Sequence, residues 1–198
     1  MRLADADADR FFAVLRPLLA FVNEQRRIVP RPVPRADGCL VAQDAAPILD
    51  VLWADDSLRD VFIAENPAQL DAEALALARS WDRRRKGTFF VWKHYRKHTL
   101  FLADDQGFAV LGLYSTFAEM LPGPLPVLVD AVLLPFGDRI ISDGLIHMKN
   151  MTFGPGIREN LRYRKRQLVA NGAIRSSLLP SPKPVPNPRS ARPRGRRP

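Results

Sequence analysis

The sequence has little of what disulfide-stabilised, zinc-stabilised and membrane-spanning proteins need. It contains one cysteine, Cys39, in 198 residues. A single thiol forms no internal disulfide and supplies no thiolate cluster for a structural zinc site. The longest apolar run, Phe11 to Val22, contains Arg16 and Pro17 and is shorter than the roughly 20 apolar residues of a bilayer span. We therefore expect neither a disulfide framework nor a transmembrane helix.

Signals for secretion and for common enzyme classes are also missing. Asp5, Asp7 and Asp9 precede the first apolar stretch, where a secretory signal carries positive charge, so we expect a cytoplasmic protein. The chain shows no P-loop, no dinucleotide fingerprint, no Ser/His/Asp elbow and no Cys/His pair. We therefore predict no catalytic residues, no cofactor and no metal.

Positive charge is present but unevenly distributed, with a formal net charge of +9. Residues 1–82 hold nine cations and fourteen acids, and residues 99–157 hold two and six. By contrast, residues 83–98 hold seven cations and no acid, residues 158–174 five and one, and residues 175–198 seven and none. Clustered charge, rather than total charge, attracts a polyanion. The sequence therefore predicts two basic patches and a basic tail on a balanced body.

The N-terminal part is predicted to be a helical region over residues 1–87. Apolar residues recur at helical spacing over residues 5–27, where Pro17 favours a kink or a split. Another apolar stripe runs from Leu70 to Trp81. Asn66 is a good N-cap for that second helix, and the cations after Trp81 are typical of a helix C-terminus.

After Gly87 the composition changes to that of short strands. Aromatic and β-favouring residues are dense over 88–92, 99–103 and 108–114, and residues 126–135 and 139–146 read as a strand pair. We expect a small curved antiparallel β-sheet or barrel, completed by a final helix.

The fold class is therefore α+β, with a β-rich unit and its closing helix over residues 88–174. Residues 175–198 contain seven prolines and no acid, and they predict a disordered Arg/Pro-rich tail.

Two stretches, VDAVLLPFGDRIISDGL at residues 129–145 and FGPGIR at residues 153–158, resemble a family of functionally uncharacterised bacterial proteins. The family is often labelled zinc-chelating because many members end in a SEC-C zinc motif. The similarity covers roughly residues 88–180. Ser142 stands where the family commonly has an aromatic residue, and the SEC-C ending is absent here, so the zinc label does not transfer. The resemblance implies a shared fold and a bacterial protein without a settled activity.

The first basic patch mixes cations with aromatic residues. Proteins that bind nucleic acid use cations for phosphates and aromatic rings for base stacking. The candidate binding residues here are Arg83, Arg84, Arg85, Lys86, Lys93, Tyr95, Arg96 and Lys97. The alternative is a helix C-terminus capped by cations, followed by a solvated hairpin tip.

His94 and His98 also invite a metal-site interpretation. On a continuous strand they would stand about 13 Å apart, too far to share one ion. With a tight turn between them they could face one another, but no Asp, Glu or Cys in that segment completes a site.

The second patch lies on the predicted final helix, where Arg158, Arg162 and Arg166 form one ridge. Gly154-Pro155-Gly156 opens that helix, either as an anion site or as a plain turn. The tail adds further candidate binding residues: Arg189, Arg192, Arg194, Arg196 and Arg197. If all seven tail cations met phosphates, log K would fall with log[salt] at a slope of about −5 on single strands. A solubilising extension is the alternative for the tail.

These patterns predict a non-enzymatic module that associates with nucleic acid, RNA rather than DNA, or with another polyanion. A protein-interaction adaptor that docks through its acidic helical region is the second hypothesis, and no membrane partner is expected. An enzyme that uses Asp143 and His147 is the third, although an Asp-Gly pair is also typical of a turn.

Overall fold

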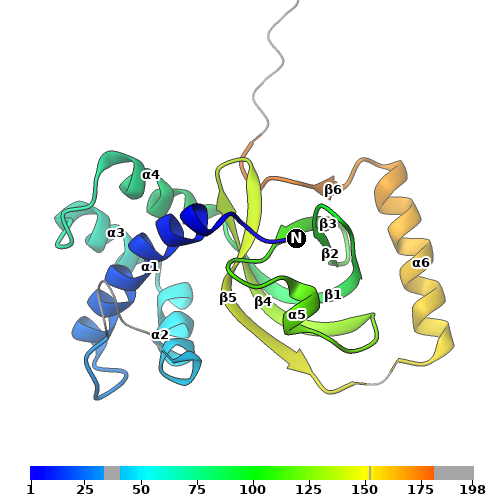
Figure 1. Ribbon diagram of the computed structural model, residues 1–198, viewed down its shortest axis with the longest axis horizontal. Coiled ribbons are helices and arrows are strands. Elements are labelled where there is room, and N and C mark those ends of the chain that lie inside the picture. Colours follow the sequence, from blue (N-terminus) through cyan, green and yellow to red (C-terminus); the bar gives the residue numbers. More distant parts are fainter. Residues whose placement is uncertain (34–40, 152, 181–198) are drawn as a thin grey trace, which may run out of the picture.

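The computed structural model describes residues 1–33, 41–151 and 153–180. Four helices cover one side of a curved sheet, and a further long helix lies on the other side (Figure 1). The elements are α1 (Asp5–Arg26), α2 (Ala42–Ala54), α3 (Asp56–Glu65), α4 (Ala72–Ser80), η1 (Trp81–Arg83), β1 (Arg85–His94), β2 (Thr99–Leu102), β3 (Gly107–Leu111), α5 (Phe117–Met120), β4 (Val127–Phe136), β5 (Arg139–Lys149), α6 (Pro155–Ala170) and β6 (Ile174–Arg175). The predicted α+β class is confirmed. None of the described helices has the length and apolar character to cross a membrane.

α1 is a single helix, without the predicted split at Pro17. A proline inside a helix removes one backbone hydrogen bond and crowds the preceding turn. Here Pro17 is itself buried, together with its neighbours Leu18 and Leu19. Packing of this apolar stripe against the other helices and the sheet sustains the helix through the missing bond.

The second predicted helix is shorter than expected. α4 begins after Asp71, whose carboxylate accepts a hydrogen bond from the backbone N–H of Ala74 at 2.8 Å. Asn66 ends α3 instead, in a left-handed conformation with a φ of 44°, and its side chain bonds both backbone groups of Leu70. Asn is favourable at either end of a helix, so the sequence pattern alone assigned it to the wrong one.

The six strands form a mixed sheet in the order β2-β1-β4-β5-β3-β6, and β2 also pairs with β3. The hairpins are antiparallel, as the sequence predicts, including the β4–β5 pair. β3, however, runs parallel to β5 and to β6, so the sheet is not purely antiparallel. Tight turns impose antiparallel pairing between successive strands, whereas parallel pairing joins segments that are distant along the chain.

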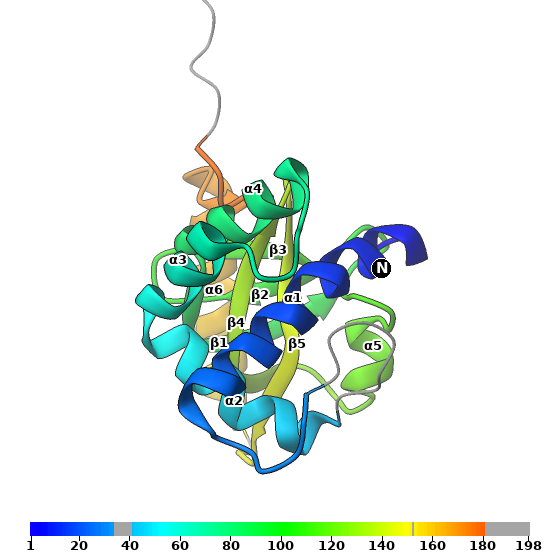
Figure 2. The same cartoon turned by 90° about the vertical axis from the view of Figure 1, so that its left-hand side faces the viewer.

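Three hydrophobic clusters hold the layers together. The largest packs α1, α2, α3 and α4 against Val132, Leu134 and Ile141 on the outer face of β4 and β5, in front of which α1 passes in Figure 2. The second lies inside the curve of the sheet, and four of its eleven buried residues are phenylalanines. The third lies under α6, where Leu161 and Leu168 meet β2. The helical region and the sheet therefore share one core.

Two predicted boundaries differ from the structure. β1 begins at Arg85, so the strand already includes Arg85 and Lys86, which the sequence assigned to the helical region. Arg175 belongs to β6, where it lies opposite Phe108 of β3, and Leu178 packs against the second cluster. The segment after residue 174 is thus held to the sheet by backbone pairing that its composition did not indicate. The predicted binding residues of the tail from Arg189 to Arg197 lie outside the described residues.

Gly112, directly after β3, lies close to the backbone of two other segments. The backbone N–H of Leu3 donates to the oxygen of Gly112 at 2.9 Å, and a Cβ on Gly112 would lie 1.9 Å from the backbone oxygen of Ser115. Backbone on two sides cannot give way as a flexible side chain does, so Gly112→Ala should lower the free energy of unfolding by about 2–3 kcal/mol. Urea denaturation measures this change. Gly123→Ala is the matched control, because a Cβ there meets nothing within 4 Å, and an equal loss in both variants would contradict the prediction.

Candidate functional site

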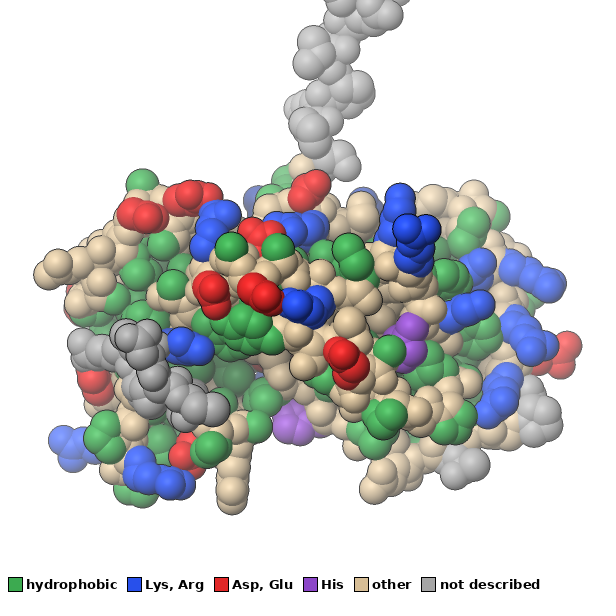
Figure 3. Space-filling model, in the orientation of Figure 1, with side chains coloured by type: hydrophobic (Ala, Val, Ile, Leu, Met, Phe, Trp, Pro, Cys, Tyr) green, Lys and Arg blue, Asp and Glu red, His purple; other side chains and the backbone are tan. Residues whose placement is uncertain are grey.

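The basic residues of the β1–β2 hairpin and of α6 lie on the same side of the molecule. Leu161 and Leu168 on the inner face of α6 pack against β2, and Trp92 and Tyr95 of the hairpin contact the same cluster. This packing places two basic stretches side by side that are some sixty residues apart in the sequence. Figure 3 shows Lys and Arg side chains gathered over α6, at the right-hand edge of the molecule.

We call this surface the cationic face and define it by six exposed residues: Lys93, Arg96, Lys97, Arg158, Arg162 and Arg166. Within the described part of the chain, none of the six forms an ion pair. Arg164, on the same helix, differs, because its guanidinium lies 3.0 Å from Asp104. Cations without a carboxylate partner attract phosphate groups more strongly, because no neighbouring negative charge neutralises them.

Two tyrosines accompany these cations. Tyr163 on α6 is 64% exposed and was not among the predicted binding residues, although an aromatic within a run of cations was visible in the sequence. Tyr95 is half-buried, and the Lys93 ammonium lies 5.6 Å from its ring centroid. An exposed ring beside cations is the arrangement on which unpaired bases stack.

The two histidines of the hairpin form hydrogen bonds that stabilise the turn. The backbone N–H of Tyr95 donates to the oxygen of His98 at 2.8 Å, and Nδ1 of His94 lies 3.0 Å from the hydroxyl of Thr99. Burial lowers the pKa of both imidazoles, so they are neutral at neutral pH and add no charge to the cationic face. Within residues 1–33, 41–151 and 153–180, no cluster of three His, Cys, Asp or Glu side chains could hold a metal ion.

The start of β1 and the residues just before it, at the end opposite to the hairpin, hold the other cations of the first basic patch: Arg83, Arg84, Arg85 and Lys86. Arg84 contacts Asp56 at 2.6 Å, Lys86 contacts Asp50 at 3.4 Å, and Arg83 contacts its neighbour Asp82 at 3.8 Å. Arg85 is exposed at the start of the strand. Because a strand of ten residues extends for about 30 Å, these cations do not join the cationic face. The structure thus divides what the sequence presents as one patch.

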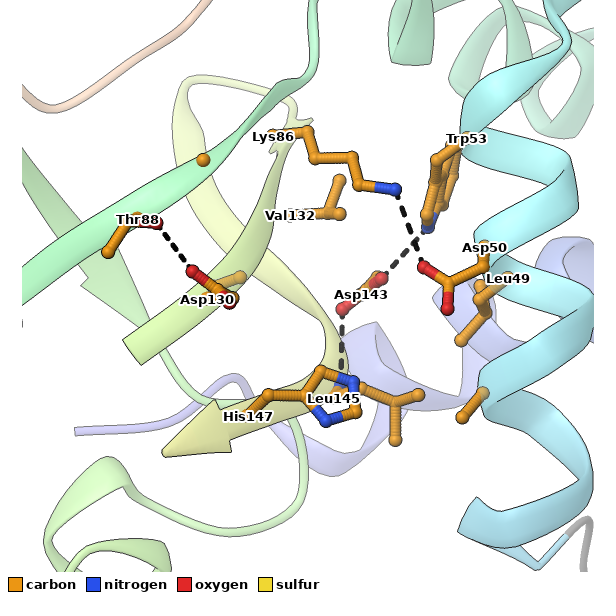
Figure 4. Close-up of a pocket in the computed structure, with 13 residues that line it drawn as sticks. Leu49, Asp50, Trp53, Lys86, Thr88, Asp130, Val132, Asp143, Leu145 and His147 are labelled. Atoms are coloured by element: carbon orange, nitrogen blue, oxygen red, sulfur yellow. Dashed lines mark hydrogen bonds and ion pairs between the residues drawn. The ribbon is translucent and has the colours of Figure 1, made fainter. Parts of the chain in front are cut away.

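A cavity of about 430 Å³ opens between α2 and the sheet (Figure 4). Four elements supply its walls, and most of its polar groups come from strands. The lining side chains that the figure labels are Leu49, Asp50, Trp53, Lys86, Thr88, Asp130, Val132, Asp143, Leu145 and His147. The two residues of the enzyme hypothesis, Asp143 and His147, therefore line the same cavity.

A bulge in β5 places Asp143 at the bottom of this cavity. Between the pairs Ala131↔Ile146 and Leu133↔Ser142, β4 has one residue and β5 has three. The middle residue of the three, Gly144, has a φ of +98°, which favours glycine. A bulge reorients the side chains next to it, and here Asp143 faces α2. The Asp-Gly turn predicted from the sequence is therefore a bulge within a strand.

The carboxylate of Asp143 is held by two N–H donors. The indole Nε1 of Trp53 donates to one oxygen at 2.8 Å, and the backbone N–H of Leu145 donates to the other at 3.1 Å. Asp143 is 5% exposed, and burial raises its pKa from 3.8 to about 6, although both hydrogen bonds and the charge of His147 act in the opposite direction. A carboxyl group with this pKa exchanges its proton close to neutral pH.

The pKa of Asp130, on the opposite wall, is shifted in the opposite direction. The Asp130 carboxylate accepts a hydrogen bond from the Thr88 hydroxyl at 2.5 Å and pairs with Lys149 at 2.9 Å, and these partners lower its pKa. The cavity therefore combines a stabilised carboxylate with a carboxyl group that is close to protonation. Trp53, which fixes the latter, carried no signal in the sequence, because nothing in α2 indicates that it faces β5.

No protein-family model, curated protein or solved structure matches this chain. The family resemblance of residues 88–180 stays a prediction, and function has to be argued from the side chains described above.

The raised pKa of Asp143 predicts how stability changes with pH. The folded protein holds this proton more tightly than the unfolded chain, so the free energy of unfolding should fall as the pH rises from 3.8 to about 6. The pKa difference corresponds to about 3 kcal/mol, which is an upper limit for this effect. Asp143→Asn should remove it. Urea denaturation of both proteins across this range measures the difference.

Asp138→Asn, an exposed carboxylate in the β4–β5 turn, serves as the control and should leave the pH profile unchanged. A constant difference between wild type and Asp143→Asn at every pH would show that Asp143 titrates alike in both states.

Proposed function

We propose that this protein binds single-stranded nucleic acid, RNA in preference to DNA, through the cationic face and without chemical turnover. One observation carries the proposal: exposed cations from the hairpin and from α6 lie together without carboxylate partners in the described part of the chain, next to an exposed tyrosine. Unpaired cations can contact phosphates, and an exposed aromatic ring can stack on an unpaired base.

The arrangement of α6 suits a flexible strand. Arg158, Arg162 and Arg166 repeat every four residues, so their ridge extends for about 12 Å along the helix. Tyr163 stands beside this ridge with most of its surface exposed. Bases within a duplex are already stacked on one another, whereas a single strand can offer a base to this ring.

The contacts described here imply sequence-tolerant binding. Cations and one ring contact phosphates and base faces, which carry little sequence information. If all six residues of the cationic face met phosphates, log K would fall with log[salt] at a slope of about −4 on a single strand. Binding should therefore be strongest at low salt.

The acidic helical region gives less support to the adaptor hypothesis. Among the described residues, nine of its carboxylates are paired with cations of the same chain rather than left for a partner: Asp5, Asp7, Asp44, Asp50, Asp55, Asp56, Asp60, Glu73 and Asp82. A surface that already neutralises itself attracts a basic partner weakly.

A filter-binding titration with oligouridylate tests the proposal. The triple variant Arg158→Ala, Arg162→Ala, Arg166→Ala should weaken binding at least about tenfold at low salt, and it should reduce the salt slope by about 2. The hairpin triple Lys93→Ala, Arg96→Ala, Lys97→Ala should act similarly. Tyr163→Ala should also weaken binding about tenfold, but with the salt slope unchanged, because stacking releases no counterions.

The triple variant Arg10→Ala, Arg26→Ala, Arg31→Ala is the matched control. It removes the same charge from exposed residues of the helical side that already pair with acids, so binding should change by less than about twofold. An equal loss of affinity in this control would show that binding depends on total charge and not on the cationic face. A chain ending at Pro180 should retain the effect of the α6 triple. Complete loss of binding in that chain would contradict the proposal.

A further inference from the structure

We propose that the cavity between α2 and the sheet is a binding site for a small organic amine with an apolar body, whose ammonium group Asp143 receives. This inference concerns residues outside the cationic face and does not depend on nucleic-acid binding.

The size and lining of the cavity fit a small molecule. Its volume of about 430 Å³ falls within the range of small-molecule sites, which are mostly apolar with a few oriented polar groups. Leu49, Val132 and Leu145 supply aliphatic surface from three different elements, and Trp53 adds an aromatic wall. An apolar body of a ligand can therefore be enclosed from several sides.

The charges of the cavity are incompletely matched. Asp50 pairs with Lys86 at 3.4 Å, and Asp130 pairs with Lys149 at 2.9 Å. Asp143, the most buried of these carboxylates, has no ion-pair partner among the described residues; its two hydrogen bonds come from neutral N–H groups. A buried carboxylate is normally paired with a positive charge, because desolvation without one is unfavourable. A ligand ammonium would supply the missing charge.

The backbone is shaped around this carboxylate. An ionised carboxylate accepts about four hydrogen bonds, so two donors leave acceptor positions for a ligand. The bulge at Gly144 directs Asp143 away from regular strand pairing and into the cavity.

Ammonium binding should depend on pH through Asp143. Asp143 must be ionised, so affinity should fall as the pH drops through about 6. The other titratable and charged groups that line the cavity are His147, Asp50, Lys86 and Asp130, and Arg16 and Tyr114 line a neighbouring apolar cavity to which Asp143 also contributes.

Three probes of similar shape separate charge from size: 2-phenylethylamine, 2-phenylethanol and phenylacetate. NMR titration of the full chain should show saturable shifts of the Trp53 indole N–H and the Leu145 amide with the amine. Affinity for the alcohol and the acid should be at least about tenfold lower. His147→Ala should keep the pH dependence, because Asp143 remains.

Two variants test the site in different ways. Asp143→Asn should remove the preference for the amine over the alcohol, and Asp138→Asn, the exposed control, should keep it. Ala46→Phe fills the cavity from α2 while Asp143 stays intact, and it should abolish binding of all three probes. Amide-signal dispersion verifies that each variant is folded, and if Asp143→Asn fails that check, Ala46→Phe carries the test.

Equal affinities of the wild type for the amine and the alcohol would overturn the proposal. So would saturable shifts that leave Trp53 and Leu145 unaffected, or undiminished amine binding by Ala46→Phe. Loss of amine binding together with intact oligouridylate binding would separate this site from the cationic face.

Discussion

β1 has to be covered on both faces, and much of the molecule follows from this constraint. Phe89 and Val91 point into the cluster inside the curved sheet, whereas Phe90 and Trp92 point outward, where the cluster under α6 covers them. α6 therefore has to lie beside the hairpin at the end of β1. Because only one stripe of α6 is apolar, its arginine ridge remains in solvent next to the hairpin cations.

The electrostatic organisation follows the same geometry. At the start of β1, cations meet the acids of α2 and α3 and form ion pairs, as Arg84 does with Asp56. At its far end the hairpin cations Lys93, Arg96 and Lys97 form no ion pair within the described residues. One strand thus joins a self-neutralising helical side to a basic side. The cavity opens on the helical side, where ion pairs surround the buried Asp143.

Some of the fold could be predicted from the sequence because local patterns decide it. The dense β-favouring residues predicted the β4–β5 strand pair, and apolar residues at helical spacing predicted α1. The start of α4 could not be predicted, since Asn66 suits either end of a helix. Nor could the parallel pairings of β3, which join residues from distant parts of the chain. The tail beyond residue 180 lies outside the described residues.

The sequence by itself determined that cations cluster in separate stretches, and it identified Arg158, Arg162 and Arg166 as one ridge, because helical spacing is a local property. The tertiary structure decided which cations stay unpaired and which carboxylate is buried. Arg84 meets an acid 28 positions away, and Asp143 meets the indole of Trp53 across 90 positions. Ion pairing and desolvation depend on neighbours in space, and those neighbours come together only when the helices pack on the sheet.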